Sequence, residues 1–71
     1  MFNIRANIFI GFDYVNWKGE FGHREVKVEE ILFGSTDYHK KEQWLMKAWD
    51  MNKQAERIFA MKDMTNVKNL R

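Results

Sequence analysis

The first clear pattern in the chain is an alternation of apolar and polar side chains over residues 7–15. Four apolar residues share one parity in this segment, namely Ile8, Ile10, Phe12 and Tyr14. Successive side chains of an extended chain point to opposite faces, so this pattern predicts a strand with one buried face. Residues 16–19 read Asn-Trp-Lys-Gly and have the chemistry of a turn. A second strand is predicted over residues 20–28, and the two strands together make a β-hairpin.

The segment after the hairpin contains a short apolar piece, Ile-Leu-Phe at residues 31–33, which ends at Gly34. We predict a third strand here, reached by a brief turn. Residues 35–42 are mostly polar, and we expect them to form the longest loop of the domain.

Two predictions compete for residues 43–60. Apolar residues recur there at helical spacing, namely Trp44, Ala48, Met51, Ala55 and Ile58. This stripe favours a long helix over residues 42–60, which would pack on the hairpin in an α+β fold. The alternative is a strand over 43–49, a turn over 50–56 and a strand over 57–61. Asp50, Asn52 and Lys53 suit such a turn.

Composition limits the class of protein. The 71 residues allow one domain with a small core, and the chain has no cysteine for a disulfide or a cysteine-based zinc site. A formal charge of +2 is too small for nucleic-acid binding by charge alone. No apolar run is long enough to span a membrane, and residues 1–10 lack the features of a signal peptide. We therefore expect a cytoplasmic protein without a membrane partner, and the small core favours a homodimer.

Two arginines lie on otherwise apolar strand faces. Arg24 shares its parity with Val26 and Val28, whereas Arg57 shares its parity with Phe59 and Met61. A guanidinium group on such a face needs a partner, and its planar fork matches phosphate oxygens. We predict that Arg24 and Arg57 hold one anionic group, with Lys47 or His39 within reach. The alternative is that both arginines pair at the rim with Glu20, Glu25 or Glu56.

Aromatic and histidine side chains add to the candidate site. Trp44 could stack on a nucleobase, although its apolar neighbours favour a place in the core. Trp17, in the predicted turn, is the better candidate for an exposed aromatic ring. His39 stands in the polar loop, where a solvated histidine is the ordinary outcome. His23 and His39 do not make a metal site without further ligands, so we expect no metal.

Signals of catalysis are weak in this sequence. It has no cysteine nucleophile, no Gly-x-Ser-x-Gly turn and no glycine-rich phosphate loop. The carboxylates are scattered along the chain, and 71 residues leave little room for a deep pocket. We expect no enzymatic activity and no cofactor.

The two ends of the chain resemble the WYL domain, a small bacterial ligand-sensing module. Its opening pattern is similar to Tyr14, Gly19, Glu20, Arg24 and Val26, with Val28 in place of a proline. In the signature triplet Gln43 replaces Trp, Trp44 replaces Tyr and Leu45 is kept. Four further positions match, namely Ala48, Asp50, Arg57 and Phe59. The closing pattern appears as Met-Lys-Asp-Met at residues 61–64, without the family's arginine.

The resemblance covers residues 10–67 and implies a single WYL-like domain over residues 1–71. Its expected fold is an all-β, SH3-like or Sm-like barrel with a short C-terminal helix over 62–70, so we follow the strand prediction for 43–61. The implied function is regulatory binding of an anionic, nucleotide-like ligand or single-stranded nucleic acid. Larger relatives carry a helix-turn-helix that regulates transcription, and none fits in this chain. The alternative function is a structural protein that pairs with itself or with a protein partner through an exposed sheet edge.

Overall fold

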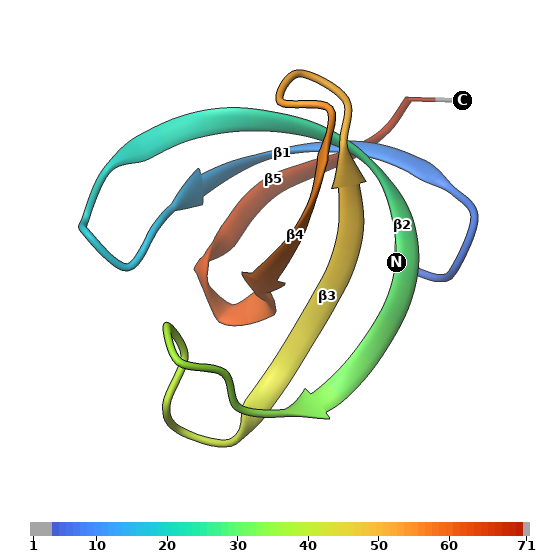
Figure 1. The fold of residues 1–71 in the computed structure, drawn as a ribbon. Coiled ribbons are helices and arrows are strands. Elements are labelled where there is room, and N and C mark those ends of the chain that lie inside the picture. The colour runs from blue at the N-terminus through green and yellow to red at the C-terminus, as the bar shows by residue number, and fades with distance from the viewer. Residues whose placement is uncertain (1–3, 71) are drawn as a thin grey trace.

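The computed structural model describes residues 4–70, which form one five-stranded antiparallel sheet (Figure 1). The strands are β1 (Phe9–Val15), β2 (Phe21–Gly34), β3 (Gln43–Asp50), β4 (Ala55–Ala60) and β5 (Met64–Asn69). A single 3-10 turn, η1 (Met61–Asp63), connects β4 to β5. The order of strands in the sheet is β4-β3-β2-β1-β5. The expected all-β class is confirmed, and the helix considered over residues 42–60 is wrong.

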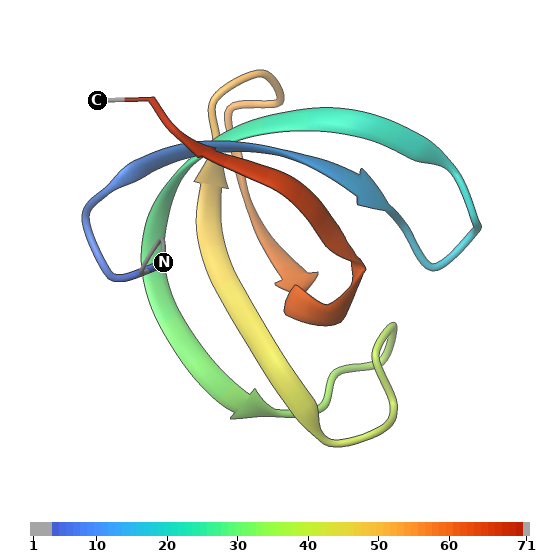
Figure 2. The same ribbon diagram turned by 180° about the vertical axis from the view of Figure 1, so that it is seen from behind.

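The long strand β2 shapes the sheet. Its first half pairs with β1, and its second half pairs with β3. The pairing with β3 shifts register between Val28 and Glu30, which is the mark of a β-bulge. β2 bends strongly, so the sheet wraps around its own core (Figures 1 and 2). The separate strand predicted over 31–33 is therefore wrong, because the bulge bends β2 without ending it.

The C-terminal helix predicted over residues 62–70 is also wrong. Residues 64–69 form β5, which pairs with β1 from Tyr14↔Met64 to Ile10↔Asn69. A nine-residue helix is marginal on its own, whereas the free edge of β1 offers backbone hydrogen bonds to an extended chain. Residues 4–70 contain no helix that is long and apolar enough to cross a membrane.

The core lies inside the curve of the sheet. The predicted inward parity of the first strand is confirmed, since Ile10, Phe12 and Tyr14 are buried. The ring of Phe59 on β4 contacts those of Phe12 and Tyr14 edge-to-face, at centroid distances of 5.1 and 4.9 Å. β1 and β4 are not neighbours in the sheet, so these contacts hold its two halves together across the core.

Side-chain oxygens define the two tight turns. Asn16 begins the β1–β2 turn, and its Oδ1 accepts hydrogen bonds from the backbone amides of Lys18 and Glu20, each 2.9 Å long. Asp50 is buried at the end of β3, and its Oδ1 accepts from the amides of Asn52 and Lys53 at 3.0 and 3.1 Å. Both turns were predicted from their Asn and Asp residues, and the first is confirmed. The second is confirmed in place but is shorter than the predicted 50–56, because β3 extends to Asp50 and β4 begins at Ala55.

Candidate functional site

A hollow of about 540 Å³ opens where the β1–β2 turn, the loop 35–42 and β4 come together. The buried rings of Tyr14 and Phe59 line its inner side, so the aromatic core is also its wall. Arg24 reaches it from β2 and Arg57 from β4. We call this space the arginine hollow.

The strand parity of the two arginines explains why they meet. Arg24 lies on the same side of β2 as the buried Val26, and Arg57 lies on the same side of β4 as the buried Phe59. Both side chains therefore leave their strands on the core side, at the place where the core ends and the hollow begins. His39 lines the same hollow, so the structure brings three of the five predicted site residues together.

Neither arginine is neutralised by a carboxylate of residues 4–70, because no ion pair in that range includes Arg24 or Arg57. Arg57 donates one hydrogen bond of 3.1 Å from Nη1 to the backbone carbonyl oxygen of Glu56. The side chain of Glu56 instead forms an ion pair of 3.8 Å with Lys47. Pairing of the arginines with Glu20, Glu25 or Glu56, the alternative expectation, is therefore not found, and both guanidinium groups keep donors for a ligand.

Two exposed aromatic rings stand at the mouth of the hollow. Trp17 and Tyr38 lie 5.4 Å apart between ring centroids with an interplanar angle of 30°. They are 59% and 66% exposed, which confirms the expectation of an exposed Trp17. The ammonium group of Lys18 lies 5.3 Å from the centroid of a Trp17 ring. We call the pair of Trp17 and Tyr38 the aromatic ridge, and its exposed surface suits stacking against a planar ligand.

A compact arrangement of hydrogen bonds fixes the loop that carries Tyr38 and His39. Thr36 and His39 exchange backbone hydrogen bonds of 2.8 and 3.2 Å. The hydroxyl of Thr36 also accepts from the amides of Tyr38 and His39, at 3.2 and 3.0 Å. These bonds order the loop locally, so Tyr38 and His39 are held at the hollow by their own segment.

The charge of the hollow is mixed. Arg24, Arg57 and Lys53 contribute three cationic groups, and Asp37 and Glu56 contribute two carboxylates. The ion pair of Glu56 with Lys47 offsets part of its charge, which leaves Asp37 as the carboxylate that opposes an anionic ligand most directly. The arrangement can therefore bind an anion through fork-shaped guanidinium donors rather than through a large positive field.

Lys47 and Trp44 do not line the arginine hollow. The side chain of Lys47 has the opposite parity to the buried Met46 and Ala48, so it leaves β3 on the outer face. Trp44 is 59% exposed, so the expectation that it belongs to the core is wrong. Trp44 has the same parity as the buried Met46 and Ala48. The pairing of β3 with β4 ends at Leu45↔Ala60, however, so Trp44 lies beyond the last residue of β4.

Trp44 belongs to a different surface of the sheet. Its ring packs edge-to-face against Phe33 at a centroid distance of 5.3 Å, and the two residues face each other in the β2–β3 register. Together with Ile31 and Met61 they line a separate hollow of about 530 Å³, which we call the apolar hollow. Trp44 therefore lies on a surface that differs in chemistry from the arginine hollow.

Sequence reasoning missed Tyr38 and Lys53 as site residues. Tyr38 is the only aromatic residue in the polar segment 35–42, and this was the signal that could have found it. Lys53 lies in the turn after β3, and nothing in its sequence neighbourhood marks it. Both come to the hollow through turns that only the folded chain positions.

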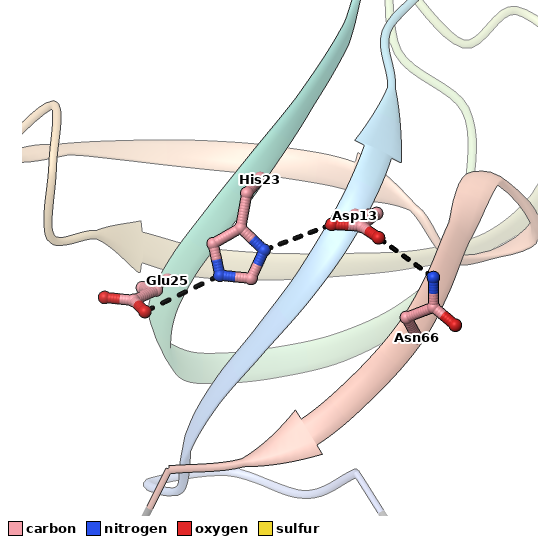
Figure 3. A network of polar contacts seen from close by, with 4 residues as sticks. All are labelled: Asp13, His23, Glu25 and Asn66. Carbon is pink, nitrogen blue, oxygen red and sulfur yellow. Dashed lines mark hydrogen bonds and ion pairs between the residues drawn. The ribbon is translucent and has the colours of Figure 1, made fainter.

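A separate polar network lies on the outer face of β1, β2 and β5 (Figure 3). His23 Nδ1 lies 3.1 Å from Asp13 Oδ1, and His23 Nε2 lies 3.5 Å from Glu25 Oε2. Asn66 donates a hydrogen bond of 2.9 Å to Asp13 Oδ2. The bond from Asn66, and then that with His23, lower the pKa of Asp13 below its ordinary value. These contacts join β1, β2 and β5 on one face of the sheet. Within residues 4–70 no group of three or more His, Asp or Glu side chains is placed to hold a metal ion.

Comparisons with protein-family models, with curated proteins and with solved structures give no match. The resemblance to the WYL domain therefore rests on the sequence motifs alone. The function is best argued from the residues that line the arginine hollow.

Proposed function

We propose that this protein is a small binding module for an anionic, nucleotide-like ligand and that the arginine hollow is its site. One observation carries the proposal: Arg24 and Arg57, from strands far apart in the sequence, line one hollow without a carboxylate partner among residues 4–70. The guanidinium groups take the phosphate, and the aromatic ridge takes the planar base.

The surroundings of the two arginines strengthen this arrangement. The inner wall is made by the buried rings of Tyr14 and Phe59, so a phosphate seated there would be partly withdrawn from water. Hydrogen bonds between charged groups are stronger where the local dielectric constant is low. Tyr14 also presents a rigid, already ordered wall, which reduces the entropy lost on binding.

The sequence resemblance supports the same proposal. Arg24 and Arg57 stand at positions where the WYL pattern has arginine, and a regulatory, ligand-sensing role in a bacterial cytoplasm follows from the family. The strand order, the bend of β2 and the contacts between β1 and β4 support the finer proposal of an SH3-like or Sm-like barrel. No catalytic step is part of this function.

Substitution of the arginines tests the proposal. Affinities for nucleotides and short single-stranded oligonucleotides would be measured by calorimetry for the wild type, Arg24→Ala and Arg57→Ala. Each variant should lose about 1.5–3 kcal/mol of binding free energy, roughly 10- to 150-fold in Kd. Arg5→Ala is the matched control, because Arg5 is exposed and does not line the hollow.

A loss of affinity can be distinguished from a loss of stability by the melting temperature. Arg57 is exposed, so its removal should leave the melting temperature close to that of the wild type. An equal affinity of Arg24→Ala, Arg57→Ala and Arg5→Ala would show that the arginine hollow is not the site. Absence of saturable binding by every ligand of the panel would remove the proposed function.

The alternative function is self-association, and the apolar hollow favours it. Trp44 and Phe33 are 59% and 55% exposed and lie side by side, which is unusual for a surface that faces only water. A second copy seated there would cover both rings. Sedimentation without ligand should then show a mass that rises with concentration, and Trp44→Lys should abolish the rise. A monomer at every concentration would exclude this alternative.

A further inference from the structure

The apolar hollow adjoins a basic one. Lys62 is the one charged residue of the described chain that lines the apolar hollow. Together with Gln43 it also lines a neighbouring hollow of about 520 Å³, in which the further lysines are Lys40 and Lys41. We call this neighbouring space the lysine hollow. Because the two hollows share residues, they form one continuous surface that is apolar at one end and basic at the other.

The apolar end is ordered but uncovered. Ile31 and Met61 are half-buried and pack against the core, so this part of its lining is fixed. The rings of Phe33 and Trp44 contact each other edge-to-face and remain more than half exposed. The pairing of β3 with β4 stops before Trp44, so no strand of residues 4–70 pairs with it on that side. Exposed aromatic rings in an ordered hollow are typical of the place where a partner inserts an anchoring side chain.

The basic end favours an acidic partner. Lys40, Lys41 and Lys62 form no ion pair with a carboxylate of residues 4–70. Glu42 and Asp63 line the same hollow, so three lysines stand against two carboxylates. A partner with carboxylates beside a bulky apolar side chain would therefore complement both ends. Because the excess of positive charge is small, the carboxylates would contribute to specificity and the apolar side chain to affinity.

Two other occupants fit this surface less well. In a two-fold dimer the same patch meets itself, so the lysines around the hollow of one copy would approach those of the other. A lipid bilayer is flat on this scale, whereas Phe33 and Trp44 line a concave space of about 530 Å³. A concave apolar space beside a basic one instead suits a single segment of chain that inserts one side chain and lays charged neighbours along the rim.

We infer that the apolar and lysine hollows together dock an extended acidic peptide of a partner protein. A bulky apolar side chain of the peptide enters the apolar hollow, and its carboxylates lie against the three lysines. An extended chain advances about 3.3 Å per residue. About eight residues therefore match the two shorter dimensions of the domain, 25 and 23 Å. The inference does not depend on the proposed anion site, because neither Arg24 nor Arg57 lines these two hollows.

Selection from a phage-displayed library of random octapeptides tests the inference without a known partner. The wild-type protein should enrich peptides that carry an aromatic or long aliphatic residue next to two or more carboxylates. Enriched peptides that lack the apolar residue, or that carry basic residues in place of the acidic ones, would overturn it. Enrichment no greater than on Trp44→Lys would overturn it as well.

Binding of an enriched, fluorescein-labelled peptide then locates the site by anisotropy. Trp44→Ala should weaken binding roughly 30-fold or more, the effect of removing an aromatic anchor. Lys62→Ala should weaken it about 1.5- to 5-fold, the range expected for an exposed charge. Trp49→Ala and Lys27→Ala are the matched controls, because both residues are exposed and line neither hollow. Equal affinities of Trp44→Ala and Trp49→Ala would overturn the inference.

The remaining measurements distinguish the possible occupants. Arg24→Ala with Arg57→Ala should bind the peptide as tightly as the wild type, so this inference and the proposed anion site can fail separately. A mass of the protein alone that rises with concentration, and no longer rises in Trp44→Lys, would assign the apolar hollow to a second copy. Co-sedimentation with phosphatidylserine vesicles that Trp44→Lys abolishes would assign it to a lipid surface. Either result would overturn the docking of a peptide.

Discussion

The backbone amide of Ala60 donates a hydrogen bond of 2.9 Å to the phenolic oxygen of Tyr14. Tyr14 lies on β1 and Ala60 ends β4, two strands that are not adjacent in the sheet, and both residues are buried. The ring of Tyr14 also lines the arginine hollow. One side chain therefore joins the two halves of the fold and forms a wall of the proposed site.

Removal of the Tyr14 hydroxyl should destabilise the fold. In Tyr14→Phe the ring contacts with Phe59 remain, but the buried amide of Ala60 loses its acceptor. A buried, unsatisfied amide costs about 1–3 kcal/mol. Urea denaturation followed by tryptophan fluorescence should show this loss in the free energy of unfolding. An unchanged midpoint would mean that water or another group satisfies the amide.

Alkaline pH should weaken the fold through the same residue. Burial raises the pKa of Tyr14 above its ordinary value of 10.0, although the bond from Ala60 acts in the opposite direction. The unfolded chain then loses this proton at a lower pH than the folded chain. The contribution of Tyr14 is fully present below the unfolded pKa and is lost as pH rises through the folded pKa. Thermal melts above about pH 10 should show a steeper loss for the wild type than for Tyr14→Phe.

Acid should act through the network of Asp13. Because the pKa of Asp13 is lowered in the folded chain, its contribution is present above the unfolded value of 3.8 and is lost as pH falls through the folded pKa. Asn66→Gly removes the main cause of the shift and preserves the positive φ of 53° at this position. Its melting temperature should fall less than that of the wild type between about pH 4 and pH 2. Parallel curves would show that the bond from Asn66 does not govern the titration.

Neutralising Asp37 should improve ligand binding. Its carboxylate lines the arginine hollow and opposes an incoming phosphate. Asp37→Asn should therefore lower the Kd by roughly 1.5- to 5-fold, the range expected for an exposed charge. Glu30→Gln is the control for net charge, because Glu30 is exposed and does not line the arginine hollow. An equal gain in both variants would indicate a general effect of charge.

Local pattern predicted those parts of the fold that depend on neighbouring residues. The burial of Ile10, Phe12 and Tyr14 could be predicted, because successive side chains of a strand point to opposite faces. The turn could be predicted from Asn16, whose side chain accepts hydrogen bonds from the turn backbone. The sequence pattern did not predict that β2 is one continuous strand, because the bulge depends on how β2 pairs with β3. The strand β5 was missed for a similar reason, since the free edge of β1 exists only after the hairpin has folded.

The site was predictable to the extent that it follows strand parity. Arg24 and Arg57 share the side of their strands with buried residues, so their approach could be inferred from the sequence. Lys47 has the opposite parity to the buried Met46 and Ala48, so strand alternation places it on the face away from the hollow. Tyr38 reaches the hollow through a loop whose shape depends on the hydrogen bonds of Thr36, and no periodic pattern encodes such a shape.

The most direct test of the central claim is a titration of ¹⁵N-labelled protein with a short oligothymidylate, followed by NMR of the arginine Nε–H and tryptophan indole signals. The structure predicts that Arg24, Arg57 and Trp17 shift together along one saturation curve. Arg5, Trp44 and Trp49 lie outside the arginine hollow and should not move. Shifts confined to Trp44, Trp49 or Arg5, or no saturable shift at all, would contradict an anionic ligand in the arginine hollow.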